Sequence, residues 1–253
     1  MKVVDLNCDM GELPEVIADG TQESLMPFLT SVNIACGGHA GDEQTMKTTI
    51  EQALRWGLAV GAHPGYPDCA NFGRLEMNLP AEAVADSVLQ QVKLLARVAG
   101  DCGAHLTHVK PHGALYNQAA CNRPLAEAIA RGVARWSRDV VLVGLAGSPM
   151  LDVFRQAGFV VAGEAFADRR YEANGGLRSR KFPDALIGDP QEASRQALRI
   201  VEQGAVTACD GTEIAVDAQT ICIHSDTPGA AQIAAGVART LRKAGIPLRA
   251  LST

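Results

Sequence analysis

The 253-residue sequence lacks any apolar run that approaches the roughly 20 residues a membrane-spanning helix needs, so no membrane association is expected. It also lacks a basic excess: 23 lysines and arginines stand against 28 aspartates and glutamates, a formal net charge of −5. General nucleic-acid binders normally carry a basic excess, so no nucleic-acid partner is expected. The first residues become polar and charged without an apolar segment, which argues against a secretory signal peptide.

The seven cysteines are scattered, and no two of them form a CxxC pair. This absence excludes a zinc ribbon and a thioredoxin-like redox motif. Scattered thiols without an export signal fit a reducing compartment. We therefore expect a cytoplasmic protein in which most cysteines are small buried apolar side chains.

No glycine-rich phosphate loop of the form GxGxxG or GxxxxGK[ST] follows any apolar run. This absence argues against the open α/β sheets that usually bind nucleotides through such a loop. The sequence instead repeats a short apolar run, a polar cluster and a helical stretch that closes on glycine. Several runs are apolar throughout, as parallel strands buried on both faces are. The repeat predicts one α/β domain over residues 1–253, folded as a closed (β/α) barrel of about seven parallel strands. The predicted strands cover residues 3–7, 31–35, 58–63, 104–110, 140–144, 159–163 and 220–224.

Two segments interrupt this repeat. Residues 168–188 show no clean period and contain two adjacent glycines, so we expect a long loop or hairpin that lies over the barrel mouth like a lid. Residues 206–216 are typical of a small β-hairpin inserted before the last strand. The basic residues of the first segment are either a solvated surface or the part of a lid that brings an arginine onto a phosphate group.

Polar and ionisable side chains gather at or just beyond the carboxyl ends of the predicted strands, whereas the opposite ends are mostly glycine, alanine and leucine. In a parallel barrel these ends open onto one face, which carries the active site in essentially every characterised case. We therefore predict that the polar residues converge on one barrel mouth. They are Asn7, Asp9, Glu12, Asn33, His39, His63, Lys110, His112, Asp168, Arg169, Arg170, His224 and Asp226.

Some of these residues have simple structural alternatives. Asp9 and Glu12 could cap the first helix, and Asp42 is better placed as an N-cap than as a catalytic group. His224 is as compatible with a hydrogen-bonded core histidine as with a ligand. Residues 36–42 are rich in glycine, which favours a close approach of the backbone to a ligand.

The stretch from His108 to His112 holds three ionisable side chains at alternate positions. Alternation along a strand turns both histidines and Lys110 to the same side. A lysine in a barrel mouth must meet a carboxylate, a phosphate group or water. One interpretation is a pair of histidines joined by an aspartate around a metal ion. The other is a lysine and histidine set that binds an anion and transfers protons. Because a lysine between the histidines disfavours a cation in the same place, we prefer the second interpretation and assign no metal ligand.

Seven blocks, in order from the first predicted strand to the last, are DLNCDMGE at 5–12, NIACGGHAGD at 33–42, GAHP at 61–64, FGR at 72–74, VKPHGALYN at 109–117, FADR at 166–169 and ICIHSD at 221–226. These blocks resemble the signatures of the LamB/YcsF family of 5-oxoprolinase A subunits. The resemblance implies an irregular (β/α) barrel of the glycoside hydrolase/deacetylase type. It also implies cleavage of 5-oxoproline (pyroglutamate) to L-glutamate, with ATP and Mg²⁺ and with two partner subunits, B and C.

The resemblance also gives roles to the ionisable residues. If ATP phosphorylates the lactam oxygen, the site needs cations for the phosphate group, a base for the attacking water and an acid for the ring nitrogen. Lys110 and either Arg169 or Arg170 are expected to bind the phosphate group, and without a fixed partner Lys110 should add little stability. The expected catalytic residues are Asp9, Glu12, His63, Lys110 and His112. Further contacts to substrate or phosphate are expected from Asn7, Asn33, His39, Arg74, Asp168, Arg169, Arg170, His224 and Asp226.

Two other functions stay open at this point. The first is a metal-dependent amide hydrolase or carbohydrate deacetylase, in which Asp9 and two histidines would hold a divalent ion. The second is a non-catalytic carrier for a carboxylated small molecule. Metal analysis distinguishes the first from an ATP-dependent enzyme, and a requirement for ATP distinguishes such an enzyme from the second.

Overall fold

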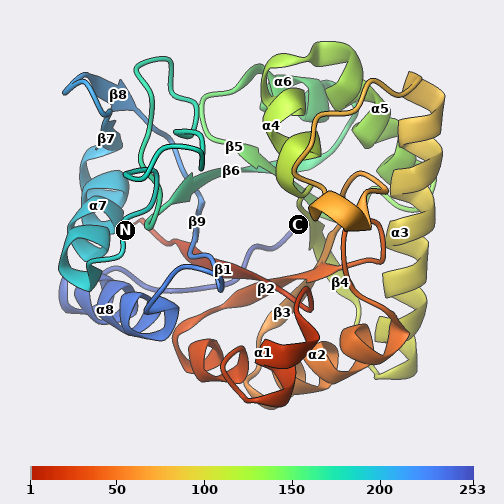
Figure 1. The fold of residues 1–253 in the computed structure, drawn as a ribbon, viewed down its shortest axis with the longest axis horizontal. Coiled ribbons are helices and arrows are strands. Elements are labelled where there is room, and N and C mark those ends of the chain that lie inside the picture. The colour runs from red at the N-terminus through yellow and green to blue at the C-terminus, as the bar shows by residue number, and fades with distance from the viewer. Residues whose placement is uncertain (1) are drawn as a thin grey trace.

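Seven parallel strands form a closed barrel in the computed structural model, which describes residues 2–253 (Figure 1). In chain order they are β1 (Asp5–Met10), β2 (Ser31–Ala35), β3 (Ala59–His63), β4 (Leu106–Val109), β5 (Val141–Leu145), β6 (Val160–Phe166) and β9 (Thr220–Cys222). Each strand pairs with the next, and β9 closes the barrel by pairing with both β6 and β1. The predicted fold class is confirmed.

Helices cover the outside of the barrel between successive strands (Figure 1). They are α1 (Pro14–Ala18), α2 (Glu43–Arg55), α3 (Ala81–Asp101), α4 (Gly113–Cys121), α5 (Arg123–Ala134), α6 (Pro149–Gln156), α7 (Pro190–Gln203) and α8 (Ala230–Lys243), with the 3-10 helices η1 (Glu23–Phe28) and η2 (Cys69–Asn71). The N-cap role predicted for Asp42 is confirmed, because its carboxylate accepts a hydrogen bond from the backbone N–H of Thr45 at the start of α2. None of the helices between residues 2 and 253 combines the length and the apolar character that a membrane crossing requires.

Three segments lie outside the repeating strand and helix units. β7 (Ala205–Thr207) and β8 (Glu213–Ala215) form an antiparallel hairpin at the edge of the molecule (Figure 1). Residues 168–188 connect β6 to α7 with isolated bridges in place of regular strands. The C-terminal segment pairs with Val4 through Leu248, and Leu251 packs on the small apolar cluster of Val141, Val143 and Ala162.

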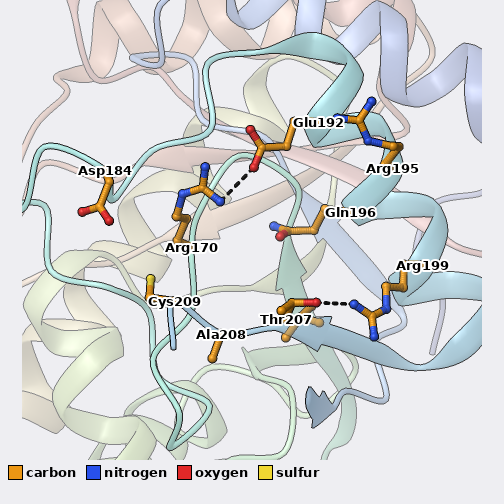
Figure 2. Close-up of a pocket in the computed structure, with 10 residues that line it drawn as sticks. Arg170, Asp184, Glu192, Arg195, Gln196, Arg199, Thr207, Ala208 and Cys209 are labelled. Atoms are coloured by element: carbon orange, nitrogen blue, oxygen red, sulfur yellow. Dashed lines mark hydrogen bonds and ion pairs between the residues drawn. The ribbon is translucent and has the colours of Figure 1, made fainter. Parts of the chain in front are cut away.

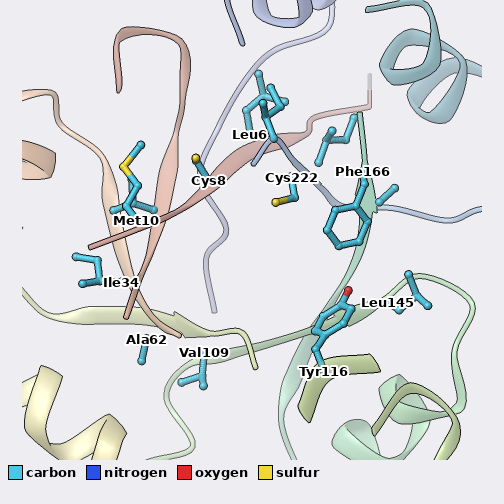
Figure 3. Packing of buried hydrophobic residues seen from close by; sticks show 14 of the residues in the cluster. Leu6, Cys8, Met10, Ile34, Ala62, Val109, Tyr116, Leu145, Phe166 and Cys222 are labelled. Carbon is cyan, nitrogen blue, oxygen red and sulfur yellow. The ribbon is translucent and has the colours of Figure 1, made fainter. Parts of the chain in front are cut away.

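Strand β1 separates its polar and apolar side chains between its two faces. Leu6 and Cys8 belong to the apolar core (Figure 3). Asp5, Asn7 and Asp9 alternate with them and form hydrogen bonds to other barrel strands. Successive side chains of a strand point to opposite faces, so these three polar residues line the inside of the barrel.

This polar interior explains why two predicted strand limits are wrong. The first strand was predicted over residues 3–7 but ends at Met10, and the sixth was predicted over 159–163 but continues to Phe166. In both cases a buried carboxylate, Asp9 or Glu164, interrupts the apolar pattern where the strand continues. A pattern that identifies strands by apolar runs places a strand end at such a residue.

Gly61 in β3 gives the clearest case of a residue type required by close packing. A Cβ atom at this position would overlap the imidazole of His108, which comes from the neighbouring strand β4. The His108 ring is fully buried and donates from Nε2 to Asn33 Oδ1 over 2.8 Å. The missing side chain at position 61 therefore makes room for an imidazole inside the barrel.

We predict that Gly61→Ala lowers the free energy of unfolding by about 1–3 kcal/mol, the usual cost of overpacking a tight interior. Gly100→Ala is the matched control, because a Cβ at this position in α3 meets no atom within 4 Å. There alanine should raise the free energy of unfolding by about 0.5–1 kcal/mol through its better helix propensity. Denaturant unfolding of the two variants measures both effects, and equal effects would contradict the packing role of Gly61.

Candidate active site at the barrel mouth

Lys110 directly follows β4 and places its ammonium group between two carboxylates. Its Nζ lies 2.9 Å from Asp9 Oδ1 and 2.8 Å from Glu164 Oε1, with Cys222 Sγ at 3.2 Å. The Lys110 side chain is 3% exposed and that of Glu164 is fully buried. Burial disfavours the charged amine, but the two carboxylates outweigh this cost and hold the pKa of Lys110 well above its usual value. The expectation that Lys110 has no fixed partner is therefore wrong.

Two asparagines fix the positions of these carboxylates. Asn33 Nδ2 donates to Asp9 Oδ1 and to Asn7 Oδ1, both over 2.8 Å. Asn7 Nδ2 donates to Glu164 Oε1 over 3.0 Å. Both asparagines were predicted as site residues, and here they act on the carboxylates of the chain itself. The charged centre is thus held by neutral donors on β1 and β2.

His63 is the last residue of β3 and lies beside Asp9. Its Nδ1 donates to the backbone carbonyl of Lys110 over 2.8 Å, and its Nε2 lies 3.3 Å from Asp9 Oδ2. Burial lowers the pKa of His63, but the Asp9 carboxylate raises it by more, so the pKa lies above its usual value. Burial likewise opposes the charge of Asp9, while His63 and Lys110 together hold the pKa of that carboxyl well below its usual value.

Glu12 connects two further histidines to the same mouth. Its Oε1 lies 3.1 Å from His39 Nε2 and 3.2 Å from His112 Nδ1. The two imidazoles are stacked, with ring centroids 3.6 Å apart and planes 3° from parallel. Burial lowers the pKa of His39 to about 4 and also lowers that of His112, so both rings are neutral near pH 7.

Asp168 and His224 form a separate pair that joins the ends of β6 and β9. His224 Nδ1 lies 3.0 Å from Asp168 Oδ1, and the backbone N–H of His224 donates to Asp168 Oδ2 over 2.9 Å. Thr227 Oγ1 donates to the same oxygen over 2.7 Å. Asp168 therefore holds two loops together, and His224 stacks on Phe166 beside the centre.

An ion-pair cluster forms the rim of the mouth. Asp226 accepts from Arg74 over 2.7 Å and from Arg180 over 2.6 Å. These residues come from three different loops, so the cluster holds segment 168–188 over the barrel mouth. Arg180 was not selected from the sequence, because its basic surroundings resemble a solvated loop. Movement of this segment as a lid stays a prediction.

The two adjacent arginines after β6 point in different directions. Arg169 is 7% exposed and donates to the backbone carbonyl of Arg178 over 2.6 Å, and burial lowers its pKa to about 10. Arg170 instead pairs with Glu192 of α7 in a separate cavity of about 470 Å³ (Figure 2). The expectation that Arg170 faces the barrel mouth is wrong, because neighbouring side chains of an extended segment face opposite sides.

Glu164 and Asp5 are two buried carboxylates that no sequence pattern selected. Glu164 is the only charged residue in β6, and this interruption of an apolar run is the signal that could have identified it. Asp5 lies deeper in the barrel and accepts from the hydroxyls of Thr30, Ser31 and Thr220. Burial raises the pKa of Asp5 to about 6 despite these three donors.

Comparison with known proteins identifies relatives of the chain by sequence and by structure. The sequence pattern of the LamB/YcsF family matches residues 4–253. A protein of Chloroflexus aggregans that is named as the A subunit of 5-oxoprolinase is 49% identical over 249 residues, which cover 98% of this chain and 99% of that protein. The crystal structure of the lactam utilization protein from Thermus thermophilus matches with a TM-score of 0.91 and 43% identity, covering 99% of this chain and 100% of that one. A family 4 carbohydrate esterase from Streptomyces lividans shares the fold, with a TM-score of 0.50 and 13% identity over 99% of this chain and 93% of that one.

Replacing Lys110 by methionine should destabilise the protein by about 3–5 kcal/mol, because two buried carboxylates lose their cation. Adding Glu164→Gln to this variant should recover part of the loss, since one of the two uncompensated charges is then removed. Lys47→Met is the control: Lys47 is 58% exposed, and such surface pairs contribute at most about 1 kcal/mol. Denaturant unfolding measures all three, and a Lys110→Met loss no larger than that of the control would contradict the compensated centre.

Asp5 should make the protein less stable as the pH rises. Its carboxyl has a pKa of about 6 in the folded chain against 3.8 for the free group, so between these values the folded state binds more protons than the unfolded state. Stability therefore falls from pH 4 to pH 6 and then levels off, by at most about 3 kcal/mol. The difference in unfolding free energy between Asp5→Asn and the parent chain should accordingly rise over this range. A difference independent of pH would show that Asp5 titrates normally.

Proposed function

The chain belongs to the LamB/YcsF family, and on this premise we propose that it is the A subunit of a cytoplasmic 5-oxoprolinase. The complex opens 5-oxoproline to L-glutamate while ATP and water are converted to ADP and phosphate. The observation that carries this proposal is the buried contact of Asp9 with both His63 and Lys110 at the barrel mouth. The relatives named as 5-oxoprolinase A subunits supply the substrate class.

The chemistry explains why ATP is needed. A five-membered lactam is a resonance-stabilised amide and a poor electrophile. Attack of the lactam oxygen on the γ-phosphorus releases ADP and gives a phosphorylated imidate, whose ring carbon accepts water more readily. The water loses a proton to a base, the ring nitrogen gains a proton and the ring C–N bond breaks, which leaves γ-glutamyl phosphate. A second water then hydrolyses this acyl phosphate and releases phosphate. The products are glutamate, ADP and phosphate.

Asp9 and His63 are suited to move these protons. His63 Nδ1 is committed to the Lys110 carbonyl, so its Nε2 is the nitrogen that exchanges a proton beside Asp9 Oδ2. The carboxylate stabilises the imidazolium that forms when the ring accepts a proton. We assign His63 as the base for water and, once protonated, as the donor to the ring nitrogen, with Asp9 as its partner.

The phosphoryl group needs a cation that is not already neutralised. Lys110 has two carboxylate partners and is therefore a poor choice. Arg74 and Arg180 share the single carboxylate of Asp226, which leaves one positive charge in excess at the rim. We assign these two arginines as the contacts for the transferred phosphoryl group, in place of Lys110 and Arg170.

Subunits B and C are needed in this proposal because the chain has no glycine-rich phosphate loop in its sequence. We assign to the partners the larger part of the ATP site, with Mg²⁺ bound to the nucleotide. The isolated chain should therefore form little or no glutamate from 5-oxoproline. Rapid glutamate formation without ATP and partners would favour a simple amide hydrolase instead.

The decisive experiment measures glutamate formed from 5-oxoproline by the complex of this chain with subunits B and C, with and without ATP. His63→Gln should lower the rate by about 10²–10⁴-fold, the usual contribution of a general acid–base residue. Glu127→Gln on the surface of α5 is the matched control and should keep the parent rate, since its side chain is 47% exposed. Parent activity in a folded His63→Gln complex would exclude the proton-transfer role.

A further inference from the structure

The backbone fixes which nitrogen of two histidines carries a proton. His63 Nδ1 lies 2.8 Å from the carbonyl of Lys110, and His112 Nε2 lies 2.9 Å from the carbonyl of Phe72. A carbonyl oxygen can only accept, so both of these nitrogens must carry hydrogen. In the neutral rings, His63 Nε2 and His112 Nδ1 are consequently lone-pair acceptors. Histidines that bind metal ions are commonly oriented in the same way, by a carbonyl on the other ring nitrogen.

These two lone pairs face each other and two carboxylates. His112 Nδ1 lies 3.0 Å from His63 Nε2 and 3.2 Å from Glu12 Oε1. His63 Nε2 lies 3.3 Å from Asp9 Oδ2 and 3.9 Å from Glu12 Oε1. Glu12 Oε1, His63 Nε2 and His112 Nδ1 thus lie close to one another as three possible ligand atoms, and Asp9 Oδ2 lies beside His63 Nε2.

The spacing fits a small tetrahedral cation. Bonds of about 2.0–2.2 Å from Zn²⁺ to nitrogen and oxygen imply edges of roughly 3.3–3.6 Å between its ligand atoms. The three distances among Glu12 Oε1, His63 Nε2 and His112 Nδ1 are 3.0, 3.2 and 3.9 Å, which lie around that value. Two imidazoles with carboxylate oxygens are also a donor set that suits zinc.

The local charge favours a divalent ion. Asp9, Glu12 and Glu164 bring three negative charges to this part of the mouth, and Lys110 supplies one positive charge. With both histidines neutral, a divalent cation brings the set to electrical neutrality. Lys110 does not occupy the same place, because it binds Asp9 Oδ1 and leaves Oδ2 toward the histidines. The lysine therefore does not keep a cation away from the two histidines in this geometry.

We propose that Glu12, His63 and His112 bind one Zn²⁺ ion or a similar divalent transition metal, with water in the fourth position and Asp9 beside His63. His39 supports the site from outside, because it stacks on His112 and contacts Glu12. A water on such an ion loses a proton near neutral pH, so the ion would place hydroxide beside the Asp9 carboxylate. With the ion bound, His63 Nε2 is a ligand and cannot accept a proton, so hydroxide on the ion would replace the water that His63 activates in the proposed function. Metal binding itself is measured without 5-oxoproline.

The test uses the full chain, freed of metal by dialysis against a chelator. Zn²⁺ is titrated by calorimetry, and Co²⁺ is titrated as a probe because tetrahedral Co²⁺ absorbs strongly in the visible range. We expect one equivalent of each metal to bind, with a tetrahedral Co²⁺ spectrum. His112→Gln and Glu12→Gln should each weaken metal binding by at least about 100-fold. Loss of a residue that only supports a ligand from outside weakens metal binding by about 10–100-fold, so a larger effect identifies a direct ligand. Circular dichroism shows whether each variant is folded, and either folded variant suffices.

Two controls separate this site from other donors. His105→Gln removes an exposed histidine and should leave the affinity unchanged. Cys222→Ser tests the neighbouring set of Asp9, Cys222 and His224, whose donor atoms also lie close together, and it should likewise leave binding intact. Absence of binding at millimolar Zn²⁺ would overturn the proposal, since a proton shared by His63 Nε2 and His112 Nδ1 would then occupy the site. A sulfur-to-Co²⁺ band that is lost in Cys222→Ser would overturn it too, in favour of the cysteine set.

Discussion

The ammonium group of Lys110 is the cation that the buried carboxylates of Asp9 and Glu164 share inside the barrel. Asp9 comes from β1 and Glu164 from β6, and Lys110 follows β4, so the contact joins strands from across the barrel. Charges this deeply buried persist only when they are paired and hydrogen-bonded. The neutral donors of Asn7 and Asn33 complete the pairing. The polar interior therefore depends on this one cation.

The backbone contributes as much to the mouth as the side chains do. Carbonyls of Lys110 and Phe72 set the tautomers of His63 and His112 and turn the free nitrogens toward the carboxylates. Close packing holds His39 in place, because a Cβ at either Gly65 or Gly73 would come within 3 Å of it. A preorganised set of acceptors results, in which each imidazole has one fixed orientation. Such a set is equally suited to hold a proton or a cation.

Three arginines of the outer loops lie at two separate sites. Arg74 and Arg180 converge on Asp226 at the barrel mouth. Arg170 turns outward to Glu192, in a cavity lined by α7 and the hairpin (Figure 2). Segment 168–188 therefore contributes to both sites.

The sequence by itself determined the number and order of the barrel strands, since their apolar runs and glycine-terminated helices depend on local patterns. It also placed Asp9, His63 and Lys110 at strand ends that share one face, because parallel strands in a barrel all point the same way. Only the tertiary structure decided the partners of these residues. Glu164 lies within an apolar run, which does not reveal its contact with Lys110, 54 residues earlier in the chain. Arg180 lies within a basic loop, which does not reveal its contact with Asp226, 46 residues later. Distances between side chains on different strands depend on how the barrel closes, which no local pattern contains.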